Sequence, residues 1–94
     1  MNDTFVNVFN RAAIFPTTFI VPSSDELRNL EIGDCVKLIS NNERFWVVIT
    51  QISKDKVNFM GKVDNELINE HPFTLGSVVS FCAYNIMDIE KHVS

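Results

Sequence analysis

The stretch FWVVITQI, residues 45–52, restricts the fold of this chain more than any other segment. It is rich in β-branched and aromatic residues, which favour an extended conformation, and it contains no glycine, proline or charge. Alternate residues of a strand point to opposite faces, and both faces here are almost wholly apolar. The pattern predicts a central strand of a β-sheet with the lone tryptophan, Trp46, in the core. A partly exposed Trp46 that serves as a binding platform is the alternative.

Shorter β-prone segments surround this strand. Apolar and polar residues alternate in strands predicted at 35–40, 57–64 and 78–83, and polar turns are predicted at 41–42 and 53–56. Residues 85–92 are expected to close the domain with a 3₁₀ or short helical turn. These signals together predict an antiparallel sheet.

Two segments, LEIGDCVKLI (30–39) and FTLGSVVSFC (73–82), share one order of residue types. Each predicts a turn that leads into a strand, with Gly33 and Gly76 at positive φ. Asp34 and Ser77 are expected to bind the nearby backbone.

Gly61 interrupts a strand pattern, which predicts a bulge or a sharp bend there. Two serines precede DELRNL, and they predict a short helical turn at 24–30. Either Ser24 is its N-cap, or Ser23 is the N-cap with Glu26 at the capping-box position.

The fold predicted from these elements is mainly β. We expect a small antiparallel SH3-like barrel of four to five strands with one short helical turn near 24–30. An open sheet with a helix packed across it is the competing architecture. The 94 residues suit a single domain, 1–94. Within it, residues 1–17 form an N-terminal extension whose apolar spacing fits a helix about as well as a strand, and we expect a strand or irregular chain there.

Charge and composition disfavour several classes of partner. The formal charge is −4, and each half of the chain holds four basic and six acidic residues, so there is no basic stripe for a nucleic-acid backbone or an anionic membrane. No apolar run approaches the roughly 18 residues that span a bilayer. No export signal is visible, so a cytoplasmic location is expected, with Cys35 and Cys82 as reduced, buried residues.

Four motifs occur in an order that resembles a known family. They are F-x-x-P-S-x-x-E-x-x-x-L-x-x-G-D-x-V-K-L-I from Phe19, E-R-F-W-V-x-I-T from Glu43, G-K-V-D-N-E-L from Gly61, and L-G-x-x-V-x-F from Leu75. Residues 18–90 are thereby similar to a family of small, mostly bacterial domains of unknown function. The family signature is E-x-[FM]-W-V, then G-x-[LV]-x-N, then G-[DS]-x-V-x-F.

The resemblance implies a small β-rich fold and no catalytic residue, because none is established for the family. Some members lie near toxin–immunity or phage-related genes. Ser77 stands where the family usually has aspartate, and residues 1–17 match nothing in it.

The sequence carries no diagnostic catalytic, metal-binding or phosphate-binding motif. His71 lies in the loop sequence NEHPF and His92 lies near the end of the chain, so both are expected to be solvated. We therefore expect a protein that is not an enzyme and that binds no metal or cofactor.

The candidate binding residues lie at the start of the central strand and in the turn after the 57–64 strand. They are Glu43, Arg44, Trp46, Asp64, Asn65 and Glu66. Arginine and tryptophan are enriched at interface hot spots, so a polar and aromatic face is predicted around them. In the structural alternative, Asn65 takes a left-handed conformation and binds its own backbone.

These residues favour a cytoplasmic protein-interaction module, of which an immunity or antagonist protein is an example. A single-stranded nucleic-acid-binding barrel is the alternative, with Phe45 or Trp46 and Phe59 as stacking residues. A hydrolase with a Cys–His or acidic pair is a third hypothesis. Weak self-association is also predicted, through the apolar N-terminal segment and a short edge strand.

Overall fold

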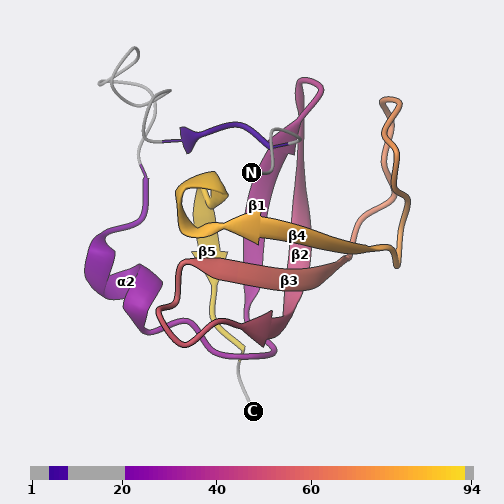
Figure 1. The fold of residues 1–94 in the computed structure, drawn as a ribbon. Helices are drawn as coiled ribbons and strands as arrows, with labels where there is room; N and C mark the ends of the chain where they lie inside the picture. Colours follow the sequence, from indigo (N-terminus) through magenta and orange to yellow (C-terminus); the bar gives the residue numbers. More distant parts are fainter. Residues whose placement is uncertain (1–4, 9–20, 93–94) are drawn as a thin grey trace.

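The structure is a computed structural model of the chain, and it describes residues 5–8 and 21–92 (Figure 1). Its regular elements are α2 Ser24–Arg28, β1 Cys35–Ser40, β2 Glu43–Ile52, β3 Asn58–Val63, β4 Val78–Cys82, the 3₁₀ turn η1 Ala83–Asn85 and β5 Asp88–Glu90. Within those residues, no helix is long and apolar enough to cross a bilayer. Most of the N-terminal extension, 1–4 and 9–17, lies outside the described residues.

The five strands form one antiparallel sheet in the order β4-β3-β2-β1-β5. β2 lies in the middle of the sheet, as predicted, and the mainly β class is confirmed. The edge strands β4 and β5 do not pair with each other within the described chain, so the sheet is not closed. The predicted barrel is therefore not confirmed.

The closing segment contains a strand that the sequence did not predict. β5 pairs with β1, with Asp88 opposite Lys37 and Glu90 opposite Cys35. The expected 3₁₀ turn is present, but it lies at Ala83–Asn85, ahead of this strand. β5 has only three residues, two of them acidic, and such a segment has no apolar pattern of its own.

The β1–β2 hairpin has a two-residue turn, as predicted. Asn41 and Asn42 both have positive φ, +48° and +60°. Two successive residues in this conformation match the twist of a hairpin, and asparagine tolerates it better than most residues. The turn sets the register in which Ser40 faces Glu43.

Two turns of the same construction lead into β1 and β4, which confirms the expectation drawn from the repeated sequence. Gly33 and Gly76 have φ of +98° and +87°. The Gly33 N–H donates to the Ile49 carbonyl at 2.9 Å, and the Gly76 N–H donates to the Val63 carbonyl at 2.8 Å. Each turn thus hydrogen-bonds to a neighbouring strand at the point where a new strand begins.

Side chains complete both turns. An Asp34 carboxylate oxygen accepts a hydrogen bond from the Glu31 N–H at 2.8 Å. The Ser77 hydroxyl accepts one from the Thr74 N–H at 3.0 Å. Both residues therefore bind the local backbone, as expected.

The irregularity predicted at Gly61 lies on the opposite strand. The β2–β3 register shifts between Ile49 and Gln51, and Gly61 faces Ile49. A Cβ at Gly61 would lie 2.5 Å from Val47 Cγ1 and 2.6 Å from the Val48 carbonyl oxygen. The glycine is required because β2 bends across it and leaves no room for a side chain.

One face of the sheet carries the hydrophobic core. Phe45, Val47 and Ile49 of β2 are each at most 1% exposed. Leu27 of α2 is buried on the same side. The buried cluster consists of Phe5, Leu27, Leu30, Val36, Leu38, Phe45, Val47, Ile49, Phe59, Val63, Val79, Phe81 and Ile86.

The short helix begins with a capping box. The Ser23 hydroxyl accepts from the Glu26 N–H at 3.2 Å, and the Glu26 carboxylate accepts from the Ser23 N–H at 3.1 Å. Ser23 is therefore the N-cap, the second of the two alternatives. The helix ends at Arg28, short of the predicted residue 30.

The described part of the N-terminal segment packs against the domain. The Val6 N–H donates to the Ile39 carbonyl at 3.0 Å. The Asn85 side-chain amide donates to the carbonyls of Phe5 and Val6 at 3.3 and 3.2 Å. Phe5 and Val8 are buried within this chain, so their apolar surface is not available for the predicted self-association, which stays a prediction.

Asp34 binds the C-terminal segment as well as the turn before β1. Its buried carboxylate lies 2.5 Å from Lys91 Nζ and accepts from the His92 N–H at 2.8 Å. Burial acts to raise the pKa of Asp34, but these two hydrogen bonds and the one from the Glu31 N–H together lower it. His92 is exposed, as predicted.

Candidate functional site

A long loop, residues 64–77, connects β3 to β4 and is here called the β3–β4 loop. It stands beside the tip of the β1–β2 hairpin, at the right of the molecule in Figure 1. Loops of this length without regular structure are uncommon in small domains and often carry function.

Glu43, the first residue of β2, binds the loop by three hydrogen bonds. Its Oε2 accepts from the Ile68 N–H at 2.8 Å, and its Oε1 accepts from the Asn69 N–H at 2.9 Å. Oε1 also lies 2.8 Å from His71 Nε2, which carries the hydrogen because a carboxylate only accepts. We call Glu43 and these three donors the Glu43 cluster.

These hydrogen bonds keep the Glu43 carboxylate ionised. The Ile68 N–H makes the largest contribution to the lowered pKa of Glu43, followed by the His71 side chain and the Asn69 N–H. Hydrogen bonds to a charged acceptor are stronger than those to a neutral one. The loop is therefore attached most firmly when Glu43 is charged.

Asn41 of the hairpin tip takes part in two further hydrogen bonds with the loop. The Asn41 side-chain amide donates to the Glu70 carbonyl at 2.8 Å, and the Asn69 side-chain amide donates to the Asn41 carbonyl at 2.9 Å. Together with the Glu43 cluster, they join the hairpin tip to the loop segment from Ile68 to His71. The sequence separations are 25 to 29 residues, so no local pattern could reveal these contacts.

The expectation that His71 is solvated is wrong. Its side chain is only 1% exposed. The ring stacks on Phe73 at 5.0 Å between centroids and meets Phe45 edge-on at 5.8 Å. The polar sequence around His71 suggested exposure, but aromatic neighbours from β2 and the loop cover it, and Glu43 supplies its polar partner.

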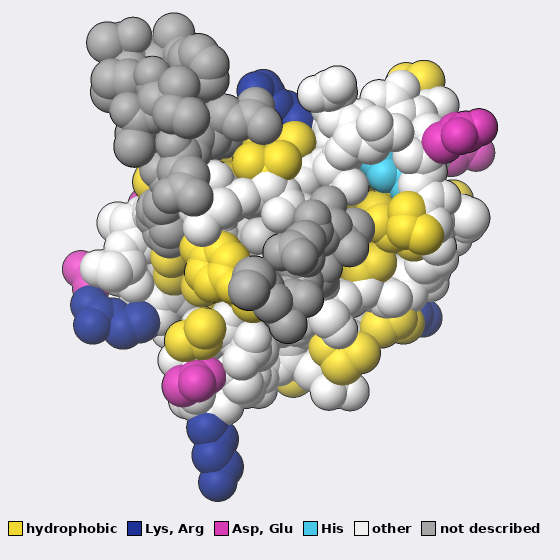
Figure 2. Space-filling model, turned by 45° about the horizontal axis from the view of Figure 1, so that its top comes forward, with side chains coloured by type: hydrophobic (Ala, Val, Ile, Leu, Met, Phe, Trp, Pro, Cys, Tyr) yellow, Lys and Arg dark blue, Asp and Glu magenta, His cyan; other side chains and the backbone are white. Residues whose placement is uncertain are grey.

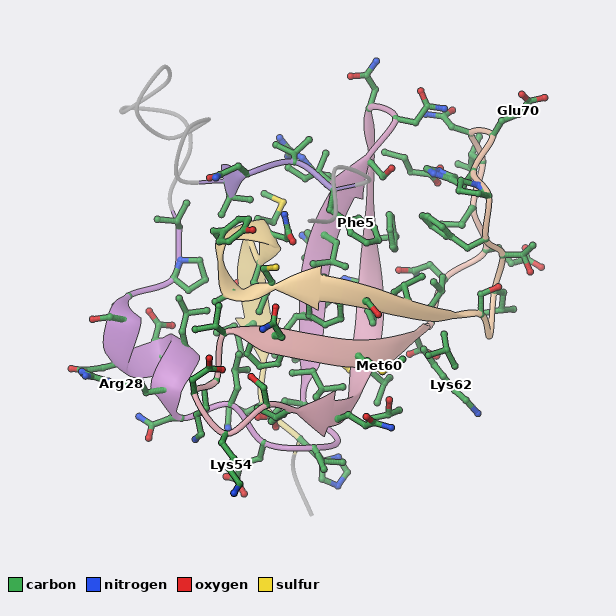
Figure 3. All side chains as sticks on the ribbon, in the orientation of Figure 1. Phe5, Arg28, Lys54, Met60, Lys62 and Glu70 are labelled. Carbon is green, nitrogen blue, oxygen red and sulfur yellow. The ribbon has the colours of Figure 1, made fainter. Side chains whose placement is uncertain are left out.

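At the tip of the loop, Ile68 is 92% exposed, the most exposed of the large hydrophobic residues described. Glu66, Asn69 and Glu70 beside it are also exposed. Figure 3 shows the labelled Glu70 at the loop tip, directed away from the body of the molecule. A hollow of about 530 Å³ lies next to the tip and is lined by Ile39, Asn42, Glu43, Arg44, Ile68 and Asn69.

The six predicted site residues do not form one face. Glu43 shares the core-facing alternation of β2 with Phe45, while Arg44 and Trp46 lie on the other face. Asp64 and Glu66 are exposed. The prediction grouped neighbours in sequence, but side chains of consecutive strand residues point in opposite directions.

Asn65 does not take the expected left-handed conformation. Its side-chain oxygen accepts a hydrogen bond from the Trp46 N–H at 2.5 Å. The Asp64 N–H donates to the Trp46 carbonyl at 2.9 Å, so Asn65 continues the β2–β3 pairing beyond the end of β3. Its role is structural, but it binds another strand and not its own backbone.

The prediction that Trp46 belongs to the core is also wrong. Trp46 is half-buried on the outer face of the sheet, and the Lys37 ammonium lies 4.9 Å from the centre of its ring. Phe45 occupies the core in its place. Both faces of the β2 segment are apolar in sequence, so alternation alone could not tell which of them the rest of the chain covers.

A second hollow, of about 420 Å³, lies on the outer face and includes Cys35 and Trp46. Burial raises the pKa of the Cys35 thiol, and the carboxylates of Asp64, Glu90 and Asp34 raise it further. A reactive cysteine needs the opposite shift, towards the thiolate. Cys35 and Cys82 are both free and half-buried.

The described residues contain no group of three or more histidine, cysteine or carboxylate side chains placed to hold a metal ion. Comparison of the chain with protein-family models, with curated proteins and with solved structures found no match. Geometry alone therefore defines the candidate site. It consists of the Glu43 cluster and the exposed loop tip around Ile68, of which only Glu43 and Glu66 had been proposed from sequence.

Proposed function

We propose that the chain is a protein-interaction module that binds its partner with the tip of the β3–β4 loop. One observation carries the proposal: Ile68 is 92% exposed, although its own backbone N–H is fixed by Glu43. Covering a fully exposed isoleucine contributes about 1.5–3 kcal/mol. A side chain held in this position is suited to insertion into an apolar pocket of another protein.

The attachment of the loop supports this function. Binding normally costs free energy, because loops and side chains at the interface must become ordered. Here the Glu43 cluster and the two asparagine bonds order the backbone around Ile68 before any partner arrives. More of the burial energy of Ile68 is then expressed as affinity.

The reactive groups support binding over catalysis. The Cys35 thiol has a raised pKa, and the His71 ring is almost completely covered. The stacking surface needed for single-stranded nucleic acid is also reduced, because Phe45 and Phe59 are buried in the core. We therefore keep protein binding as the single proposed function.

An SH3-like arrangement of the sheet is part of the proposal. The strand order supports it, because β5 returns after η1 to pair with β1. Folds of this kind serve many unrelated functions, so the fold alone names no partner.

Comparative capture tests the proposal. The wild-type chain, an Ile68→Asp variant and an Ile32→Asp control are immobilised and exposed to an extract of the source cells at low salt. Ile32 is 65% exposed and lies in the turn before β1, so its substitution makes the same change of charge and also removes exposed apolar surface. A specific partner is retained by the wild type and the control and lost with Ile68→Asp.

Reconstitution with that partner gives the quantitative result. We expect Ile68→Asp to weaken binding by at least about tenfold, equivalent to 1.4 kcal/mol, and Ile32→Asp to leave it unchanged. The loop tip is not the binding site if every protein captured by Ile32→Asp is also captured by Ile68→Asp, or if the reconstituted partner binds both variants equally.

A further inference from the structure

The first half of the β3–β4 loop, residues 64–70, is acidic. Residues 64–77 contain Asp64, Glu66 and Glu70 and no lysine or arginine. All three carboxylates are exposed. They have no fixed cationic partner among the described residues, unlike Asp34, which binds Lys91.

Two of these carboxylates stand on either side of the exposed isoleucine. Glu66 precedes Ile68 by two residues and Glu70 follows it by two. The Glu70 carbonyl is bound by Asn41, so the backbone that carries this carboxylate has a fixed position. Figure 2 shows acidic and apolar side chains together at the right of the molecule, where the loop lies in Figure 1.

Lys62 and Arg44 lie outside residues 64–77. Lys62, on β3, is directed away from the labelled Glu70 in Figure 3. Arg44 lines the hollow beside Ile68 and limits the acidic surface on the β2 side. The loop tip is therefore an apolar residue between acidic groups, with one cation at its border.

We infer that the partner of this loop presents a basic surface around an apolar pocket. This inference rests on the proposed function and adds the chemistry of the partner. Charge complementarity is the observation that selects it, because the exposed carboxylates would repel an acidic surface and would lose hydration against an apolar one. Ile68 fills the pocket, and Glu66 and Glu70 face basic groups at its rim.

The carboxylates and Ile68 are expected to affect different rates, of association and of dissociation. Rim charges mainly accelerate association and make it sensitive to salt. A buried apolar anchor mainly slows dissociation. Charge reversal at the rim is therefore expected to slow association, whereas Ile68→Asp is expected to accelerate dissociation.

A random-peptide display library tests the chemistry independently of the native partner. The library is selected on the full chain, and peptides that also bind Ile68→Asp are removed. The remaining peptides are measured against the wild type, a Glu66→Lys/Glu70→Lys variant and an Asp88→Lys/Glu90→Lys control. The control changes the formal charge equally at exposed positions of β5.

We expect the selected peptides to carry net positive charge together with apolar residues. Reversal at Glu66 and Glu70 should lower their association rate by about tenfold or more at low salt, with little effect from the β5 control. Ile68-dependent peptides that are neutral or acidic, or that respond equally to both reversals, overturn the inference and leave the proposed function standing. A library without Ile68-dependent peptides also overturns it, while the capture experiment judges the proposed function separately.

Discussion

The Glu43 carboxylate at the start of β2 lies 2.8 Å from Nε2 of His71, a residue 28 positions later in the chain. The pair joins the central strand to the β3–β4 loop. Because the same carboxylate also binds the N–H groups of Ile68 and Asn69, one side chain makes three of the hydrogen bonds that attach the loop tip.

We predict that Glu43→Gln loosens the loop tip without unfolding the domain. Glutamine has nearly the same shape, but it removes the charge and one acceptor oxygen. Amide hydrogen exchange at Ile68 and Asn69 should become at least about tenfold faster, since charge-assisted bonds are the strong ones. Glu66→Gln, in the same loop, is the control. Unchanged protection at both amides would show that the asparagine bonds alone hold the loop.

Stability should fall as the solution is acidified. The pKa values of both Glu43 and Asp34 are lowered in the folded protein, from ordinary values of 4.5 and 3.8. Each carboxylate therefore stabilises the fold above its ordinary pKa, and this contribution is lost as pH falls through the lower, folded value. Urea denaturation from neutral pH downward measures the loss. Glu43→Gln should show a shallower pH dependence, and an identical one would contradict the role of this residue.

Gly61→Ala should destabilise the domain by about 1–3 kcal/mol, the usual cost of overpacking. The added Cβ would lie within 2.6 Å of two atoms of β2, one of them a backbone oxygen that cannot move aside. Lys62→Ala, at the exposed neighbouring position, should change stability by no more than about 0.5 kcal/mol. Equal thermal midpoints for the two variants would mean that β2 relaxes freely around Gly61.

Asn65→Ala should cost about 1–3 kcal/mol, because it leaves the Trp46 N–H without its acceptor. The fluorescence of Trp46, the only tryptophan, should change in the folded state, and its unfolding curve reports the loss. Glu66→Ala is the control in the same turn. A variant that keeps full stability but loses partner binding would instead indicate that Asn65 belongs to the binding surface.

The elements that depend on local chemistry were predictable from sequence. The Ser23 capping box, the asparagine hairpin turn and the positive φ of Gly33 and Gly76 each follow from one or two residue types at fixed spacing. Alternation also located β1, β3 and β4, and the β-branched and aromatic residues of 45–52 located β2. These features need no knowledge of the distant chain.

The predictions that were wrong concern residues whose surroundings come from distant parts of the sequence. The covered face of β2 depends on residues such as Phe59 and Phe81, which lie in other strands, so Phe45 and Trp46 could not be distinguished locally. His71 is buried by Phe45 and Phe73 and is bound by Glu43. Ile68 did carry a signal, since it lies with Leu67 in an otherwise polar loop sequence, but the hydrogen bonds that fix it are long-range.

The chemistry of the Glu43 cluster has a consequence for how the protein can diversify. At positions 68 and 69 it binds backbone N–H groups, which every residue except proline provides. The residue at position 68 can therefore be substituted while the hydrogen bond from its backbone N–H to Glu43 is kept. Single substitutions at this tip, in evolution or in protein design, can therefore change which partner it binds, while Glu43 keeps the backbone in place.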